Sequence, residues 1–380
     1  MSHPPPHRYI SDGIAKGFPG YALRAAVARS VETESRGGAP ILTLGHLAHL
    51  SGAPYLYLRQ VVQRVTDPYI DITRPKKTGG MRAISSPEPV LMDVQRLILR
   101  RALEGMQLHS ASFAYRKNRS IILCAKRHIG ARWLMKFDLH DFFGYISEYQ
   151  VHEVFRARGY QPLIALELAR LCTRSSHIAR RGGRPSRYAS IPSYDSDAPG
   201  HLPQGGPASG ALSNAVAASL DGAIMDLSLK AGFTYTRYSD DIVLSTSDHF
   251  NRNHARSVIR EMRRTVSEHG FRLHEKKTRV VPPGARHVVL GLLLGEEVVR
   301  LPPEYRRRVE VHVRGVAKFG LLEHVEHRGY DSILSFISHV DGCLAFAAAV
   351  EAGWAAKMAY EWREALSAQG FPSESDSGLG

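Results

Sequence analysis

Residues 236–244 read TRYSDDIVL, and this stretch does most to decide the fold. Two adjacent acids, Asp240 and Asp241, interrupt a run of apolar and β-branched residues that alternates like a hairpin from Phe233 to Ser245. Aspartate has a low strand propensity, and two like charges at short range repel each other. The pattern therefore predicts a hairpin whose turn binds a divalent cation. For this stretch alone, the alternative is a plain turn with two solvated aspartates.

A third acid, Asp138, stands at the end of a second apolar strand, within FDLHDFF at residues 137–143. If the two strands lie side by side in one sheet, Asp138 converges with Asp240 and Asp241. Three carboxylates suit two Mg²⁺ ions about 3.5–4 Å apart, with Mn²⁺ as a substitute, and such a pair promotes in-line displacement at phosphorus. Alone, Asp138 also fits a helix cap or a turn. We expect Asp141 to orient backbone near a nucleotide, with metal ligation as the alternative.

Elsewhere in the chain, helix and strand signals alternate irregularly, and most strands come as hairpins. The patterns predict a helical hairpin over residues 41–66, a β-hairpin over 69–84, single helices over 209–230 and 252–269, strands at 278–282, 287–294 and 297–301, and helices from 303 to 367. This order favours an α+β chain with antiparallel sheets, followed by a small helical domain.

The composition is that of a globular protein with a basic excess. The 380 residues include 50 Lys and Arg against 36 Asp and Glu, a net charge of +14 that suggests a polyanionic partner such as nucleic acid. The apolar fraction excludes a wholly disordered chain, and no run of about 18 uncharged apolar residues predicts a membrane span. Three cysteines without a Cys-x-x-Cys pair, and no visible secretory signal, favour a cytoplasmic protein.

Five motifs, in this order, resemble those of reverse transcriptases. They are PKKTGGMRAI at 75–84, FDLHDFF at 137–143, LPQGGPAS at 202–209 with Ser213-Asn214 following, YSDD at 238–241 and VVLG at 288–291. The bacterial retron type is the most similar branch, through AYRKNRSI at 114–121 and CAKRH at 124–128. The chain departs from that branch at Cys124, where Asn is usual, at Leu290, where Thr is usual, and at Ser239, where Ala is usual. Other small defence-associated bacterial reverse transcriptases stay open as an alternative.

The resemblance implies a right-hand polymerase with fingers, an antiparallel-sheet palm and a helical thumb. The expected boundaries are an N-terminal helical region at 1–66, fingers with the start of the palm at 67–136, a palm at 137–300 with a loop or insertion at 174–202, a helical thumb at 301–367 and a disordered tail at 368–380. Asp138, Asp240 and Asp241 are the expected catalytic and metal-binding residues.

The resemblance also assigns residues to the nucleotide and to nucleic acid. Lys77 and Arg82, on the basic hairpin, are expected at the triphosphate, where positive charge offsets the charge of the phosphates. Phe143 is expected to exclude a 2′-hydroxyl, and Gln204 to lie near the nucleotide and template. For Lys77 and Arg82 the alternative is a solvated surface hairpin, and for Phe143 it is ordinary core packing. Expected contacts with RNA or DNA phosphates come from Arg116, Lys117, Arg119 and, in the thumb, Arg307, with a solvated face as the alternative for both surfaces.

The implied activity is RNA-directed DNA synthesis from dNTPs. Retron kinship further implies a structured non-coding RNA of the msr–msd type as primer and template, and RNA-linked DNA (msDNA) as product. It also implies a role in antiphage defence beside a separate effector protein. No membrane partner is expected. A non-catalytic RNA-binding protein with a degenerate palm is the alternative from another class. A DNA-templated or untemplated polymerase is the third.

Overall fold

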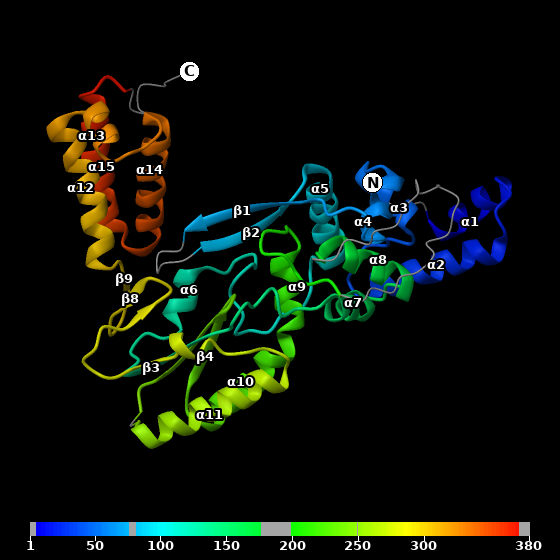
Figure 1. Cartoon of the computed structure of the whole chain (residues 1–380), viewed down its shortest axis with the longest axis horizontal. Coiled ribbons are helices and arrows are strands. Elements are labelled where there is room, and N and C mark those ends of the chain that lie inside the picture. The colour runs from blue at the N-terminus through cyan, green and yellow to red at the C-terminus, as the bar shows by residue number, and fades with distance from the viewer. Residues whose placement is uncertain (1–4, 76–80, 176–198, 249, 372–380) are drawn as a thin grey trace.

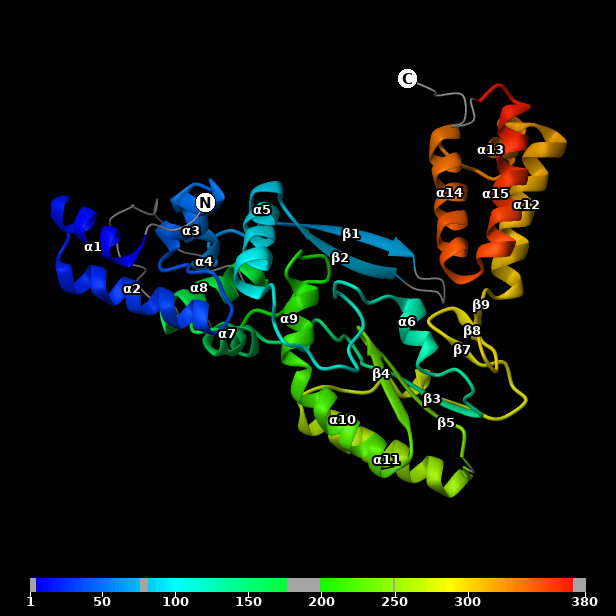
Figure 2. The ribbon, with the colours of Figure 1, turned by 180° about the vertical axis from the view of Figure 1, so that it is seen from behind.

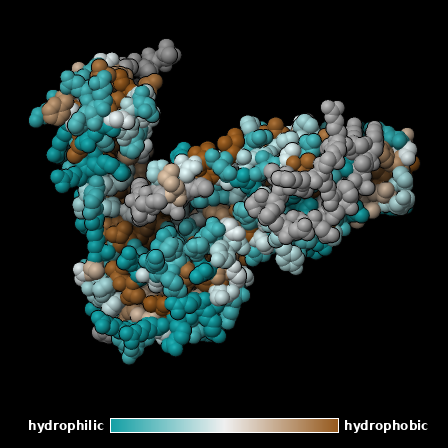
Figure 3. All heavy atoms as spheres, in the orientation of Figure 1, coloured by the Kyte–Doolittle hydropathy of each residue, from teal (hydrophilic) through white to brown (hydrophobic). Residues whose placement is uncertain are grey.

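The computed structural model describes residues 5–75, 81–175, 199–248 and 250–371, without the side chains of Arg82 and Ala83. It has the right-hand architecture of a polymerase, with antiparallel sheets and a separate helical thumb (Figure 1). An open notch separates the thumb from the rest of the molecule in the space-filling view (Figure 3). The α+β class predicted from the sequence is confirmed.

The N-terminal region is helical and leads into the fingers. Its helices are α1 (Pro6–Ala15), α2 (Gly20–Ser35), α3 (Leu44–Ser51) and α4 (Tyr55–Val62), followed by α5 (Pro89–Ile98) and a π-helical turn (Leu99–Leu103). Between α4 and α5 the strands β1 (Tyr69–Pro75) and β2 (Met81–Pro87) form an antiparallel hairpin in which Tyr69 pairs with Pro87 and Pro75 with Met81. The hairpin projects from α5 toward the thumb (Figures 1 and 2).

The palm is a four-stranded antiparallel sheet in the order β4-β5-β3-β6. The strands are β4 (Thr234–Tyr238), β5 (Asp241–Thr246), β3 (Trp133–Asp138) and β6 (Arg279–Val281), and the nearby helices are α6 (Ile121–Lys126), α9 (Ser209–Val216), α10 (Ala218–Lys230) and α11 (Arg252–Glu268). The apolar residues of β3 and β5 alternate between two core clusters on opposite sides of the sheet. The single helix predicted over 209–230 is wrong. The chain breaks at Ala217 because α9 packs against α7 while α10 packs against β4 and α11.

A small three-stranded sheet connects palm and thumb. It follows the short 3₁₀ turn η2 (Glu275–Lys277) and contains β7 (Val288–Val289), β8 (Leu292–Leu294) and β9 (Val299–Arg300). The single strand predicted over 287–294 is wrong, because Leu290 and Gly291 adopt φ of +49° and +81° and turn the chain back on itself. Left-handed residues of this kind form tight hairpin turns.

The thumb consists of α12 (Pro303–Phe319), α13 (Leu321–His327), α14 (Ile333–Val350) and α15 (Ala352–Ser367), which enclose their own hydrophobic core. Helix α14 is long and apolar enough to cross a membrane by length and composition, which is weak evidence because helices of ordinary domains meet the same criterion. The expectation that the chain has no membrane span therefore stays untested. The predicted domain boundaries also stay predictions.

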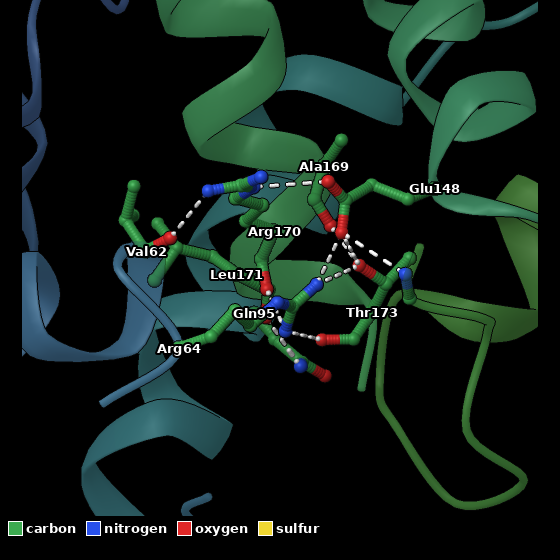
Figure 4. Close-up of polar contacts among 9 residues, drawn as sticks. Val62, Arg64, Gln95, Glu148, Ala169, Arg170, Leu171 and Thr173 are labelled. Atoms are coloured by element: carbon green, nitrogen blue, oxygen red, sulfur yellow. Dashed lines mark hydrogen bonds and ion pairs between the residues drawn. The ribbon is translucent and has the colours of Figure 1, made fainter. Parts of the chain in front are cut away.

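A buried charge network closes the base of the predicted insertion. Helices α7 (Glu148–Ala157) and α8 (Pro162–Cys172) precede it, and Arg174 and His201 pair across its two ends. Glu148 accepts hydrogen bonds from Arg64 at 2.5 Å and from Arg170 at 2.9 Å (Figure 4). Residues 176–198 of the predicted loop or insertion, and residues 372–380 of the predicted tail, lie outside the described residues.

Candidate active site

The palm sheet brings the three predicted carboxylates to one edge. Asp138, the last residue of β3, stands opposite Asp241, the first residue of β5, in the antiparallel register. The Leu139 N–H donates to the Asp240 carbonyl at 3.0 Å, which fixes the turn beside the end of β3. Asp138 is buried, Asp240 is half-buried and Asp241 is exposed. The convergence on one site is therefore a feature of the fold, while the catalytic role of the three residues stays a prediction.

A buried ion pair holds the turn between β4 and β5. Ser239, in this turn, has φ of +59°, a strained conformation for a residue with a side chain. Arg237 donates to the Ser239 carbonyl at 3.0 Å and pairs with Asp221 of α10 at 2.7 Å, with neither side chain exposed. The sequence analysis quoted Arg237 but assigned it no role, and it missed Asp221 because nothing local links a helix acid to a strand 16 residues away.

The electrostatics of the cluster reflect incomplete charge compensation. Desolvation raises the pKa of Asp241 to about 6, and repulsion by Asp240 and Asp138 adds to the shift. Burial likewise raises the pKa of Asp240, with repulsion by Asp138 adding to it, while hydrogen bonds from its own backbone and from the Ser239 side chain oppose the rise. Carboxylates that resist ionisation in this way favour the approach of a cation.

The cation that the structure places at the cluster is Lys277, at the end of η2. Its ammonium donates to Asp138 Oδ2 at 2.8 Å, and its side chain is half exposed. The sequence analysis missed Lys277, and the only local signal is the basic pair that it forms with Lys276 before a strand. Across the described ranges, no three histidine, cysteine or acidic side chains are grouped so as to hold a metal ion.

Of the residues predicted at the nucleotide, Phe143 is connected to the turn of Asp240 through Tyr115. Phe142 is buried in the core, whereas Phe143 is half-buried and packs edge-to-face on Phe142 and on Tyr115, with centroids 5.4 and 6.2 Å away. Both aromatics thus pack in the palm core, Phe142 within it and Phe143 partly buried against it. Asp141 adopts φ of +45° and is exposed, and its carbonyl accepts a hydrogen bond from the Tyr145 N–H at 3.0 Å.

The loop that carries Gln204 packs against the fingers. The Ser85 N–H of β2 donates to the Gln204 carbonyl at 2.8 Å. Gly205 has φ of +134°, and a Cβ there would lie 2.7 Å from the Ser85 carbonyl oxygen, so the close approach requires glycine. Lys77 lies outside the described residues, and so does the side chain of Arg82. Their predicted roles, and that of the Gln204 side chain, stay predictions.

The predicted basic surface before α6 divides into anchored and exposed cations. Arg116 donates to the carbonyls of His109 and Ser112 at 2.8 and 2.9 Å, which ties its guanidinium to the loop. Lys117 pairs with Glu104, and Arg119 lies 4.8 Å over the ring of Phe113. Both are exposed at the surface. The structural role of Arg116 was not foreseen, and the predicted phosphate contacts of all three stay predictions.

Arg307 lines a large groove on the thumb. The groove has a volume of about 1150 Å³, and α12, α13 and the small sheet enclose it. Figures 1 and 2 place α14 on the side of the thumb facing β1 and β2, with α12 farther away. The apolar lining includes Val311 and Phe319, and the cationic lining includes Arg300, Arg307, Arg314, Lys318 and Arg328.

Comparisons with known proteins agree with the motifs. Residues 74–294 match the family described as "Reverse transcriptase (RNA-dependent DNA polymerase)". The chain is 31% identical to the retron Mx162 reverse transcriptase of Myxococcus xanthus, over 66% of this chain and 54% of that protein. It is also 31% identical to the retron Ec86 reverse transcriptase of Escherichia coli, over 69% of this chain and 72% of that protein. The chain thus spans about half the length of the first relative.

Among solved structures, the chain is similar to a telomerase from Candida albicans in complex with a fragment of telomeric RNA. The TM-score is 0.42 at 11% identity, over 87% of this chain and 68% of that chain.

Proposed function

This chain belongs to the retron type of the reverse transcriptase (RNA-dependent DNA polymerase) family, and we propose that it copies an RNA template into DNA by adding deoxynucleotides to a primer hydroxyl. The observation that carries the proposal is the register of β3 and β5, which sets Asp138 opposite Asp241 with Asp240 in the adjoining turn. A nucleotidyl transfer centre needs such a group of carboxylates at the end of adjacent strands, where substrate can reach them.

The donor chemistry fits divalent cations, although the three side chains are not grouped as a ready set of ligands in the part of the chain that the structure describes. All three side chains offer hard oxygen ligands, and the raised pKa values of Asp240 and Asp241 mean that a cation stabilises their ionised forms. We assign Mg²⁺, as two ions, to Asp138, Asp240 and Asp241, with Mn²⁺ as a substitute. Bound there, the ions would activate the attacking hydroxyl and stabilise charge on the phosphates. Lys277 neutralises part of the charge on Asp138 and must yield when a cation binds there.

The chain's own side chains supply nucleotide binding. We assign Lys77 and Arg82, from the basic motif at 75–84, to the triphosphate, where cations offset developing charge. We assign Phe143, which contacts Tyr115 and through it the turn of Asp240, to the sugar, where a rigid ring would exclude a 2′-hydroxyl. We assign Gln204 and Asp141 to positioning of nucleotide and template.

The partner we propose is a structured non-coding RNA of the msr–msd type, which primes and templates synthesis of msDNA in the cytoplasm. The cationic thumb groove around Arg307, outside the carboxylate cluster, supports this partner because guanidinium groups bind phosphates. Lys117 and Arg119 offer a second set of exposed cations. An antiphage role beside a separate effector protein belongs to the same proposal.

Primer extension with purified protein tests the catalytic assignment. Replacing Asp240 and Asp241 by Ala should lower dNTP incorporation at least about a hundredfold, because the cation ligands are removed, while RNA binding persists. The matched control is Asp93→Ala, which removes an exposed acid of α5 paired with Arg96. Incorporation that persists in the double variant would contradict the assignment and favour a degenerate palm.

Two further measurements test template and partner. RNA and DNA homopolymer templates, offered with each of the four dNTPs, should give incorporation only of the complementary nucleotide on RNA. Equal use of DNA templates, or incorporation without complementarity, would contradict RNA-directed synthesis. Nucleic acid that co-purifies with the chain should be one species of fixed length, sensitive to both RNase and DNase. Its absence would contradict the retron-type partner.

A further inference from the structure

Tyr115, in the loop before α6, is held in an unusual conformation that no assigned role requires. Its φ is +56°, a left-handed conformation that costs energy for a residue with a large side chain. The side chain is 53% exposed, yet both of its ends make specific contacts. Strain retained at a half-exposed aromatic beside a catalytic site points to a functional constraint.

Two contacts join Tyr115 to the site. Its hydroxyl lies 3.1 Å from Ser239 Oγ, in the turn that carries Asp240, and its ring packs edge-to-face on Phe143 at 6.2 Å between centroids. Helix α9 leaves room for the ring, because a Cβ at Gly210 would lie 2.4 Å from Tyr115 Cγ. Three separate segments of the chain therefore converge on this one side chain.

Ser239 brings the contact next to the carboxylates. It directly precedes Asp240 in the turn between β4 and β5, and its hydroxyl faces that of Tyr115. Contacts thus run from Phe143 through Tyr115 to the residue that adjoins Asp240. Alanine at position 239 would lose the contact with the Tyr115 hydroxyl.

We propose that Tyr115 is a specificity-determining residue of the polymerase site. It holds Phe143 in place against the sugar of an incoming nucleotide and fixes the turn of Asp240 through Ser239. An aromatic ring excludes a 2′-hydroxyl only if it cannot retreat, and the edge-to-face contact with Tyr115 blocks retreat on one side. The inference rests on the proposed function, since it concerns the choice between deoxynucleotides and ribonucleotides by the same site.

The experiment compares kcat/KM for a dNTP and its matching rNTP on one primer–template. Tyr115→Asn removes the ring, and asparagine accepts a left-handed backbone. We expect this variant to lower the dNTP/rNTP ratio at least tenfold, mainly by lowering KM for the rNTP. Tyr115→Phe keeps the ring and should keep the ratio within twofold, while kcat for the dNTP falls about threefold to tenfold because the hydrogen bond is lost.

A double-mutant cycle tests the link through Ser239. Ser239→Ala should lower kcat at least as much as Tyr115→Phe, and the combined variant should be no slower than Ser239→Ala alone, because both remove one contact. Multiplicative losses would overturn the coupling. Tyr149→Asn, at a 70% exposed tyrosine of α7, is the matched control and should change neither the ratio nor kcat.

The outcomes separate this inference from the proposed function. A wild-type chain that incorporates no nucleotide overturns the proposed function and this inference with it. An active wild type whose dNTP/rNTP ratio is unchanged in Tyr115→Asn overturns the specificity role alone. If Tyr115→Asn melts at a lower temperature than the control variant, Tyr115→Phe and the double-mutant cycle decide the coupling. Tyr115→Phe keeps the packing of the ring, and Ser239→Ala removes only a hydroxyl.

Discussion

Two acidic clusters, Glu148 with its arginines and the three aspartates at the palm edge, differ in how their negative charge is compensated. Glu148 is buried between Arg64 and Arg170, and it also accepts hydrogen bonds from Thr173 and from the Gly200 N–H (Figure 4). Burial alone would raise the pKa of Glu148, but the two arginines outweigh it and lower the pKa. At the palm edge, Lys277 pairs with Asp138, and the charges of Lys277 and Lys136 do not outweigh the desolvation and repulsion that raise the pKa of Asp241 to about 6.

The difference distinguishes a structural acid from a reactive one. The partners of Glu148 are all supplied by the fold, so the carboxylate has no capacity left for a ligand. The aspartate cluster lacks the positive charge that it needs, and a site that stores unfavourable charge in the folded state is a candidate for binding a cation. Asp221, which is fully buried against Arg237, belongs with Glu148, although Arg237 also holds the turn that carries Asp240.

The largest expected effect on stability comes from breaking the compensated cluster. Glu148→Ala leaves two buried guanidinium groups without their carboxylate, and we expect the free energy of unfolding to fall by about 3–5 kcal/mol. Urea denaturation followed by circular dichroism measures this. A loss below about 1 kcal/mol would mean that the arginines find other partners and that the two clusters are less different than their geometry indicates.

At the palm edge, we expect a substitution to raise the free energy of unfolding. Asp241→Asn removes one of three mutually repelling charges, so the metal-free protein should gain about 0.5–2 kcal/mol while it loses incorporation. The same denaturation measurement, made with a chelator present, checks the gain. A destabilised but active variant would place Asp241 among the structural acids.

The pH dependence sharpens the same contrast. The pKa of Asp241 is about 6 in the folded chain, against an ordinary value of 3.8 for the unfolded chain. Between pH 3.8 and pH 6 the folded state therefore binds more protons than the unfolded state. The stability contribution of Asp241 therefore rises as pH falls through 6 toward 4, with a slope below about 1.4 kcal/mol per pH unit, since the residue is partly in solvent. Asp241→Asn should remove this rise when unfolding is measured from pH 7 to 5. Glu148, with a lowered pKa, should contribute full stability above its ordinary value of 4.5.

The smallest effect is expected where charges are already solvated. Arg264 of α11 lies near Glu261 and Glu268 with more than half of its side chain exposed. Arg264→Ala should change the free energy of unfolding by less than about 0.5 kcal/mol, because water and salt screen such pairs. A loss comparable to that of Glu148→Ala would show that burial is not what separates the clusters.

Much of the fold followed from local patterns. Alternating apolar residues predicted the strands that became β3, β4 and β5, and the order of five motifs predicted a polymerase with an antiparallel palm. Errors arose where one pattern crossed a change of neighbours, as at Ala217, or a left-handed turn, as at Leu290. Apolar periodicity indicates which face of a segment is buried, but it does not show where the packing partners of that segment change.

The sequence by itself determined which acids stand at strand ends and which apolar residues alternate, because both depend on neighbours in the chain. Only the tertiary structure decided which charges are compensated. Lys277 reaches Asp138 across 139 residues and Tyr115 reaches Ser239 across 124, while Arg64 meets Glu148 across 84. Such pairs form because packing of the whole chain brings distant segments to one place, and no local spacing encodes that distance.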